Sequence, residues 1–172
     1  MNSVQVHLAL THVPVILSIA GLLMLIVSFF LKNSTITKTS YILILIAGIA
    51  AIPVFYTGEG AEEAIENLPG VSGALIEKHE DLAKLSMISI TTAGLLSLLA
   101  LFTFKWQKVA GIFKVVILII AIITGGLMAQ TAHLGGQVRH TEIRSSVALL
   151  NSNDSGSAMD GDVGEKQQKD DD

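Results

Sequence analysis

Long stretches without charged side chains dominate the pattern of this chain. Asp, Glu, Lys and Arg are absent from residues 1–31, 39–58, 85–104 and 115–138. Each stretch reaches or exceeds the roughly 20 residues that a helix needs to cross the hydrocarbon core of a bilayer. Four transmembrane helices are therefore predicted, at about residues 12–31, 41–57, 82–104 and 112–133. The fold class expected is all-α, an integral membrane four-helix bundle.

The segments outside the spans are polar. The longest connection is an outer loop at residues 58–81, rich in carboxylates, where a short surface helix at 61–68 would be broken by Pro69-Gly70. Ser72 could then cap a helix that runs into the third span. Pro53 predicts a kink or an end of the second helix. The bundle is expected to occupy residues 1–144, and residues 145–172 to form a disordered acidic tail.

The basic residues favour one orientation in the membrane. The two short connections between spans are rich in lysine: Lys32, Lys38, Lys105, Lys108 and Lys114. Because cytoplasmic loops carry an excess of Lys and Arg, both termini and the acidic loop are predicted to lie outside, in the periplasm of a bacterial inner membrane. Nothing basic precedes His7, as a signal peptide would require, so the first span is predicted to remain in place.

Composition narrows the possible chemistry. Charged residues make up 15% of the chain, well below the roughly 25% of a soluble domain. The absence of cysteine excludes disulfides, thiolate metal sites, iron–sulfur clusters and covalently attached haem. A net charge of −4 without a basic patch argues against a nucleic-acid partner. No serine or threonine has a plausible catalytic partner, so the chain is not expected to be a hydrolase and need not be an enzyme.

The histidines gather on the predicted outer side. They are His7, His12, His79, His133 and His140. At about 1.5 Å of helix rise per residue, His12 and His133 lie about 30 and 28 Å from the lysines at the opposite ends of their spans. His7 and His79 lie further out. Two layers are therefore predicted, His12 with His133 and His7 with His79, while His140 is expected to be solvated.

The histidines also continue stripes of small and weakly polar residues at helical spacing. These stripes are His7, Thr11, Ser18, Gly21 and Ser28 in the first span; His79, Ala83, Ser86, Ile90, Ala93, Ser97 and Ala100 in the third; and Ile122, Gly126, Gln130 and His133 in the fourth. Such stripes mark the faces where membrane helices approach one another. The histidines are therefore predicted to face the bundle interior, where ionisable residues are functional candidates.

Three interpretations of these histidines stay open. The first is b-type haem held by two of His7, His12, His79 and His133, preferably His12 with His133, since bundle cores commonly host such cofactors. Arg139 and Arg144 could then pair with the propionates. The role would be electron transfer, or that of a redox-partner subunit in a membrane complex.

The second interpretation is a divalent metal ion bound by the same histidines with carboxylates of the acidic loop, such as Glu63 and Glu80. Histidine and carboxylate together suit zinc, iron or copper(II). Against it, the spacing of His7 and His12 sets their rings about 140° apart on an ideal helix. The third interpretation is structural, an accessory subunit without a cofactor, whose partners are the lipid bilayer and other membrane proteins.

Several short motifs resemble an uncharacterised bacterial family of four-span membrane proteins, one of the domains of unknown function. They are His7-Leu-Ala-Leu-Thr-His12-Val-Pro14, Thr57-Gly58-Glu59, Leu68-Pro69-Gly70-Val71, Glu77-Lys78-His79-Glu80 and His133-Leu-Gly-Gly136. The resemblance extends from about residue 4 to 144 and departs at Val13, where that family usually has phenylalanine. It implies a compact inner-membrane bundle, often found near cytochromes, in which His7, His12, His79 and His133 belong together. It implies no established activity.

Overall fold

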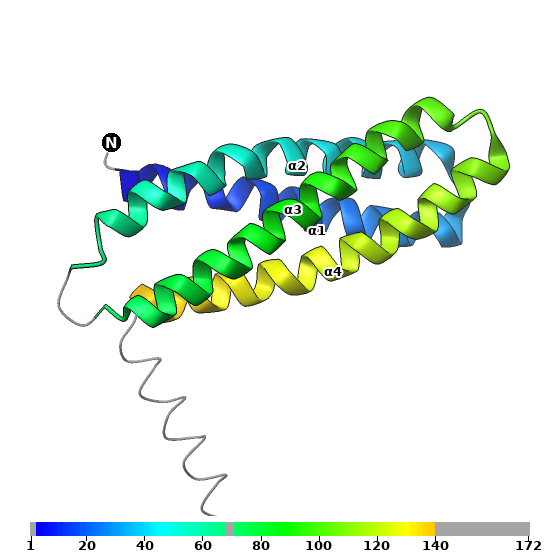
Figure 1. Ribbon diagram of the computed structural model, residues 1–172. Helices are drawn as coiled ribbons and strands as arrows, with labels where there is room; N and C mark the ends of the chain where they lie inside the picture. Colours follow the sequence, from blue (N-terminus) through cyan, green and yellow to red (C-terminus); the bar gives the residue numbers. More distant parts are fainter. Residues whose placement is uncertain (1–2, 68–70, 140–172) are drawn as a thin grey trace, which may run out of the picture.

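The computed structural model describes residues 3–67 and 71–139. This part of the chain forms four helices without strands: α1 (Ser3–Leu31), α2 (Ser34–Glu63), α3 (Gly73–Thr103) and α4 (Gln107–Arg139) (Figure 1). Each helix is long and apolar enough to cross a membrane. The prediction of an all-α fold with four helices that could each span a membrane is thus confirmed. The acidic tail predicted from residue 145 lies outside the described residues.

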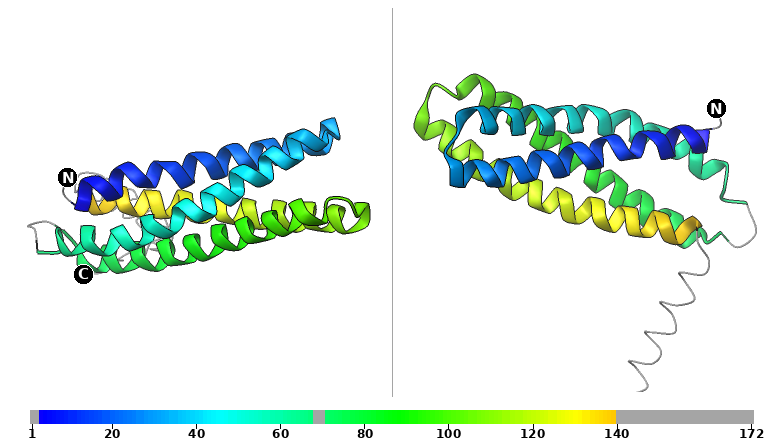
Figure 2. Two further views of the ribbon diagram at one scale, coloured as in Figure 1. Left: turned by 90° about the horizontal axis from the view of Figure 1, so that it is seen from above. Right: turned by 180° about the vertical axis from the view of Figure 1, so that it is seen from behind.

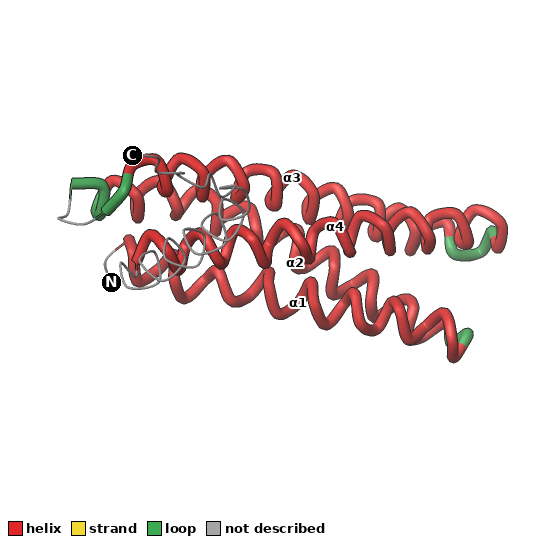
Figure 3. The backbone as a smooth tube through the Cα atoms, turned by 90° about the horizontal axis from the view of Figure 1, so that it is seen from below, coloured by secondary structure: helices red, strands yellow, loops and turns green. Residues whose placement is uncertain are grey.

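The helices extend further than the predicted spans. α2 continues past Pro53 to Glu63, and α3 begins at Gly73, so the connection between them is much shorter than the predicted loop at 58–81 (Figure 3). The start of α3 directly after Ser72 agrees with the predicted cap position. The difference has a simple cause. The first charged residue after an uncharged run marks where the hydrocarbon core can end. The helix itself can continue into water, because charged side chains such as that of Glu63 remain exposed there.

The turn between α1 and α2 is tight. Lys32 adopts a positive φ of 48°, which lets the chain reverse at once. The side chain of Asn33 then accepts hydrogen bonds from the backbone N–H groups of Thr35, at 2.8 Å, and Ile36, at 3.3 Å. These bonds satisfy donors that a helix N-terminus leaves free, so α2 begins at the next residue.

Successive helices lie side by side, and α1 and α4 are the neighbours that pack least closely. The α1–α2 and α3–α4 connections lie at one end of the bundle, here called the lysine end (Figures 1 and 2). The start of α1, the α2–α3 connection and the end of α4 lie at the other. It is called the histidine end because it carries His7, His12, His79 and His133. The four histidines therefore lie at the end opposite the lysine-rich connections, as predicted, and Lys78 and Lys84 of α3 lie at the histidine end with them.

The interior is built from small and hydroxyl-bearing side chains, as expected where membrane helices approach closely. Ser28, Ser40, Ser97 and Thr124 are fully buried, whereas large apolar side chains such as Phe30 are exposed. The backbones of α2 and α3 approach closely. A Cβ atom on Gly48 would lie 2.9 Å from the carbonyl oxygen of Ile90. Glycine at this position lets the two backbones meet.

The predicted packing faces are correct for two of the three helices. The stripes in α1 and α3 face the interior, where Ser18, Ser28, Ser86 and Ser97 are buried. The predicted face of α4 is wrong, because its stripe points outward. Its four exposed residues are Ile122, Gly126, Gln130 and His133. α4 instead packs through Ile117, Ala121, Thr124 and Val138, which are buried.

Candidate cofactor site

A cavity of about 750 Å³ lies at the histidine end and is lined by all four helices. Most of its wall is apolar. The polar side chains that line it are His7, Thr11, His12, Glu59, Glu62, His79, Glu80, Ser86 and Thr131. The volume falls within the range of about 300–1,000 Å³ that is typical of small-molecule and cofactor sites. The site is therefore a largely apolar chamber with polar groups concentrated toward one end of the bundle.

His7, from α1, is held by α2. Its Nδ1 lies 3.1 Å from the carbonyl oxygen of Val54 and 3.3 Å from Oγ1 of Thr57. Since a carbonyl oxygen can only accept, Nδ1 carries the hydrogen and donates it. In the neutral ring, Nε2 is then left with a free lone pair.

His79, from α3, is held by α4 in the same way. Its Nδ1 donates to the carbonyl oxygen of Thr131 at 3.0 Å. The hydroxyl of Thr131 also pairs with that of Ser86 at 3.0 Å. The wall that carries His79 is thus tied together by bonds between α3 and α4, and Nε2 of His79 is again left as an acceptor.

A glycine lies beside each of these two rings. A Cβ atom on Gly58 would be 3.3 Å from Cε1 of His7, and one on Gly135 would be 3.1 Å from Cε1 of His79. Each glycine lies four residues after the residue whose carbonyl the histidine contacts. Gly58 follows Val54, the partner of His7, and Gly135 follows Thr131, the partner of His79. The two histidine settings therefore share one construction, built once on α1 and α2 and once on α3 and α4.

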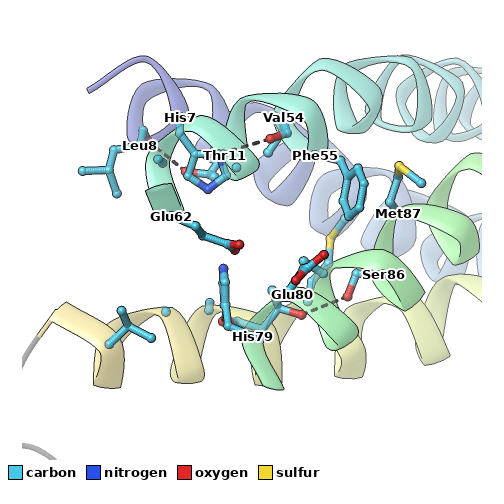
Figure 4. Close-up of a pocket in the computed structure, with 18 of the residues that line it drawn as sticks. His7, Leu8, Thr11, Val54, Phe55, Glu62, His79, Glu80, Ser86 and Met87 are labelled. Atoms are coloured by element: carbon cyan, nitrogen blue, oxygen red, sulfur yellow. Dashed lines mark hydrogen bonds between the residues drawn. The ribbon is translucent and has the colours of Figure 1, made fainter. Parts of the chain in front are cut away.

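The two rings face a common space. Figure 4 shows His7 and His79 approaching the cavity from opposite sides, with the carboxylate of Glu62 between them. Glu62 is partly buried near the end of α2, and Glu80 lines the same cavity but is exposed. The arrangement places two nitrogen lone pairs and one carboxylate around one space.

The other two predicted histidines are arranged differently. His12 is exposed at the rim of the cavity, and its Nδ1 donates to the carbonyl oxygen of Leu8 in its own helix at 2.8 Å. His133 is exposed outside the cavity, where its Nε2 accepts from the amide of Gln137 at 2.8 Å. The structure therefore brings together His7 and His79, the predicted outer layer, and does not bring His133 to His12.

The secondary candidates contribute little to this space. Glu63 is exposed and does not line the cavity. The side chain of Arg139 and all of Arg144 and His140 lie outside the described residues. Within residues 3–67 and 71–139, no three His, Cys, Asp or Glu side chains form a group that could hold a metal ion.

The sequence argument missed the groups that orient the two rings. The backbone carbonyls of Val54 and Thr131 carry no residue-type signal, because every residue has a carbonyl. The glycines offered a partial signal, since Gly135 lies two residues after a histidine, but its partner ring belongs to another helix. Comparison of the chain with known protein families, curated proteins and solved structures found no match.

Proposed function

We propose that the chain binds b-type haem in the cavity at the histidine end, with His7 and His79 as the two axial ligands, and that it transfers electrons. One observation carries the proposal: both rings donate Nδ1–H to a backbone carbonyl of the neighbouring helix. Histidines that ligate a metal are commonly held in this way, because the second hydrogen bond fixes the tautomer and the ring orientation. His7 and His79 replace the pair preferred from sequence, His12 and His133.

The shape and chemistry of the cavity also suit haem. A flat macrocycle needs walls of small side chains, and Gly58, Ala61, Ala83, Gly135 and Gly136 line this cavity. Haem needs only two protein ligands, one on each side of the ring, and the two histidines come from opposite sides (Figure 4). The cofactor itself would supply the one-electron chemistry, while the protein supplies ligands and an apolar surrounding.

A divalent metal ion is the second candidate. The observation that favours it is the carboxylate of Glu62, which points between the two histidine rings (Figure 4). Two imidazoles and one carboxylate are a common ligand set for zinc and iron. The candidate ranks below haem because the described residues form no group of three that could hold the ion without rearrangement.

The cellular setting is part of the same proposal. We infer a bacterial inner membrane with the histidine end on the periplasmic side, supported by the lysines that gather at the other end. The bundle would act as an electron carrier or as a redox-partner subunit. The motifs that resemble those of the uncharacterised four-span family would agree with a role beside cytochromes.

Absorbance spectroscopy tests the proposal. The full-length protein, expressed with ample haem supply and purified in mild detergent, should show a Soret band that shifts on reduction with dithionite. His7→Ala and His79→Ala should each lose the spectrum of a bis-histidine haem, while His133→Ala should retain it. Circular dichroism would establish that all variants keep their helices.

Two results would overturn the haem assignment. One is wild-type protein without a Soret band, and the other is a His79→Ala variant with the wild-type spectrum. Metal analysis of the same samples addresses the second candidate. Metal bound by the wild type and lost in Glu62→Gln would favour the ion over haem.

A further inference from the structure

The contacts between α1 and α4 concentrate toward the lysine end. There, Nζ of Lys114 donates to the carbonyl oxygen of Ser28 at 3.1 Å. Further along, the hydroxyl of Ser18 contacts the sulfur of Met128 at 3.3 Å. These contacts lie between Ser18 and the lysine end of the bundle. The cavity lies toward the other end, where residues of both α1 and α4 line it.

Six exposed residues line the cavity: Leu8, His12 and Ile16 on α1, Glu59 on α2, Glu80 on α3 and Ala132 on α4. The four on α1 and α4 carry no formal charge other than the imidazole of His12. We call these four residues, Leu8, His12, Ile16 and Ala132, the lateral mouth. At about 1.5 Å of rise per residue, Ala132 lies about 27 Å from Lys114 and Ile16 about 24 Å from Lys32. In a hydrocarbon core about 30 Å thick, the mouth faces the lipid of one leaflet.

We propose that the lateral mouth binds a quinol dissolved in the membrane, and that this quinol is the electron donor to the cavity. The inference rests on the proposed haem function. A quinol combines a flat polar ring with an apolar tail. The tail could remain in the lipid beside Ile16 and Ala132, while the ring meets the one imidazole of the mouth, that of His12.

His12 has the geometry to accept a quinol hydroxyl. Its Nδ1 donates to the carbonyl of Leu8, so Nε2 of the neutral ring is free to accept a hydrogen bond. Unlike His7 and His79, this ring is tied only to its own helix and is exposed. It can therefore meet a molecule that arrives from outside the cavity.

The reaction balances with the haem as acceptor. One quinol gives up two electrons and two protons and becomes a quinone. The haem that His7 and His79 would hold would accept these electrons one at a time. One quinol would therefore serve two protein molecules, or one molecule twice if it is reoxidised in between. His12 accepts one proton at Nε2 and releases it to water at the exposed rim, and the other proton passes to water directly.

Photolabelling tests quinol binding without depending on haem. The full-length protein in phospholipid vesicles is irradiated with an azido-substituted quinone that carries an apolar tail, and the labelled peptides are identified. Label is expected on α1 near Leu8–Ile16 and on α4 near Ala132. Ala132→Phe fills the mouth and should reduce labelling about fivefold or more, whereas Ala129→Phe, exposed on the same helix but outside the cavity, should not. Equal labelling of both variants would overturn the proposal and indicate unspecific contact through the lipid.

Haem reduction provides the second test. An apolar benzoquinol should reduce the ferric protein in vesicles, and His12→Ala should slow this step by about tenfold, as expected for the loss of one hydrogen bond to the reacting group. The rate with dithionite should not change, and His133→Ala should behave as the wild type.

The outcomes separate the two proposals. A wild-type protein without a Soret band refutes the haem function, while the labelling experiment still decides whether a quinol binds. A normal Soret band with the same quinol rate in wild type, Ala132→Phe and His12→Ala refutes the quinol inference and leaves the haem function intact.

Discussion

The α2–α3 contact at Gly48 yields the most direct prediction of stability. In Gly48→Ala, the new Cβ atom would lie 2.9 Å from the carbonyl oxygen of Ile90 and 3.3 Å from Cα of Thr91. Both are backbone atoms of α3 and cannot rotate away. Because ordinary contacts begin at 3.4 Å, the helices must separate locally by about half an ångström, which loosens close packing on both sides.

The magnitude follows from two opposing effects. Overpacking a close contact typically costs about 1–3 kcal/mol, whereas replacing glycine by alanine within a helix gains up to about 1 kcal/mol. Gly126→Ala is a matched control, because it lies in a helix and has nothing within 4 Å of the new Cβ atom. Since the gain in helix propensity is common to both variants, Gly48→Ala should be less stable than Gly126→Ala by about 1–3 kcal/mol.

Reversible unfolding in mixed micelles would measure this difference. Each variant is titrated with sodium dodecyl sulfate in a mild detergent, and the helical signal is followed by circular dichroism. Gly48→Ala should unfold at a clearly lower mole fraction of dodecyl sulfate than Gly126→Ala. Equal midpoints would mean that α2 and α3 do not meet at Gly48, and the packing described for this seam would be wrong.

Three further predictions concern single contacts. Lys114→Ala removes the hydrogen bond to the carbonyl oxygen of Ser28 and a cation that lies 4.2 Å from the centre of the Phe29 ring. It should therefore lower the unfolding free energy by about 1–2 kcal/mol. Lys108→Ala, at an exposed lysine, should change the unfolding free energy by less than about 0.5 kcal/mol. Asn33→Ala removes the cap of α2 and should cost about 1 kcal/mol, as measured by the same titration. Gly135→Ala pushes on the nearby histidine ring and should weaken haem binding about 10–100-fold. Gly126→Ala, which does not line the cavity and has nothing within 4 Å of its new Cβ atom, should bind normally in a haem titration.

Much of the fold could be predicted because charge and hydropathy respond directly to the bilayer. Four uncharged runs located four helices, and the lysines located one end of the bundle. The lengths of the helices could not be predicted in this way. α2 and α3 continue beyond the uncharged runs, and only contact with neighbouring helices decides how far. The cavity wall depends on this extension, because Gly58, Glu62 and His79 all lie in the connection at 58–81 that was predicted to be outside the spans.

The packing face of α4 shows a different limit. This helix carries small or polar residues on more than one face. Thr124 and Thr131 lie on one side, and Gly126 and Gln130 on another. Sequence periodicity alone is therefore compatible with either side as the packing face. The partners resolve the choice: Thr124 bonds to Ser89 at 2.6 Å, and Thr131 bonds to Ser86. These hydroxyl pairs between α3 and α4 specify the packing face of α4. They cannot be predicted from the sequence of α4 alone, because they depend on which residues of α3 lie opposite.

The choice of His7 and His79 over His12 and His133 follows from how each ring is held. Within residues 3–67 and 71–139, the hydrogen bonds of His12 and His133 stay inside their own helices, so no neighbouring helix of this part of the chain orients either ring. His7 and His79 each donate to a carbonyl of the adjacent helix. Each ring also lies against the glycine that follows this carbonyl by four residues. Because α1–α2 and α3–α4 are successive hairpins that start from the same end of the bundle, the repeated construction places two equivalent rings on opposite walls. A ligand that needs two fixed nitrogen atoms, one from each side, is matched by this pair before it binds, and preorganisation of this kind strengthens binding because less freedom is lost.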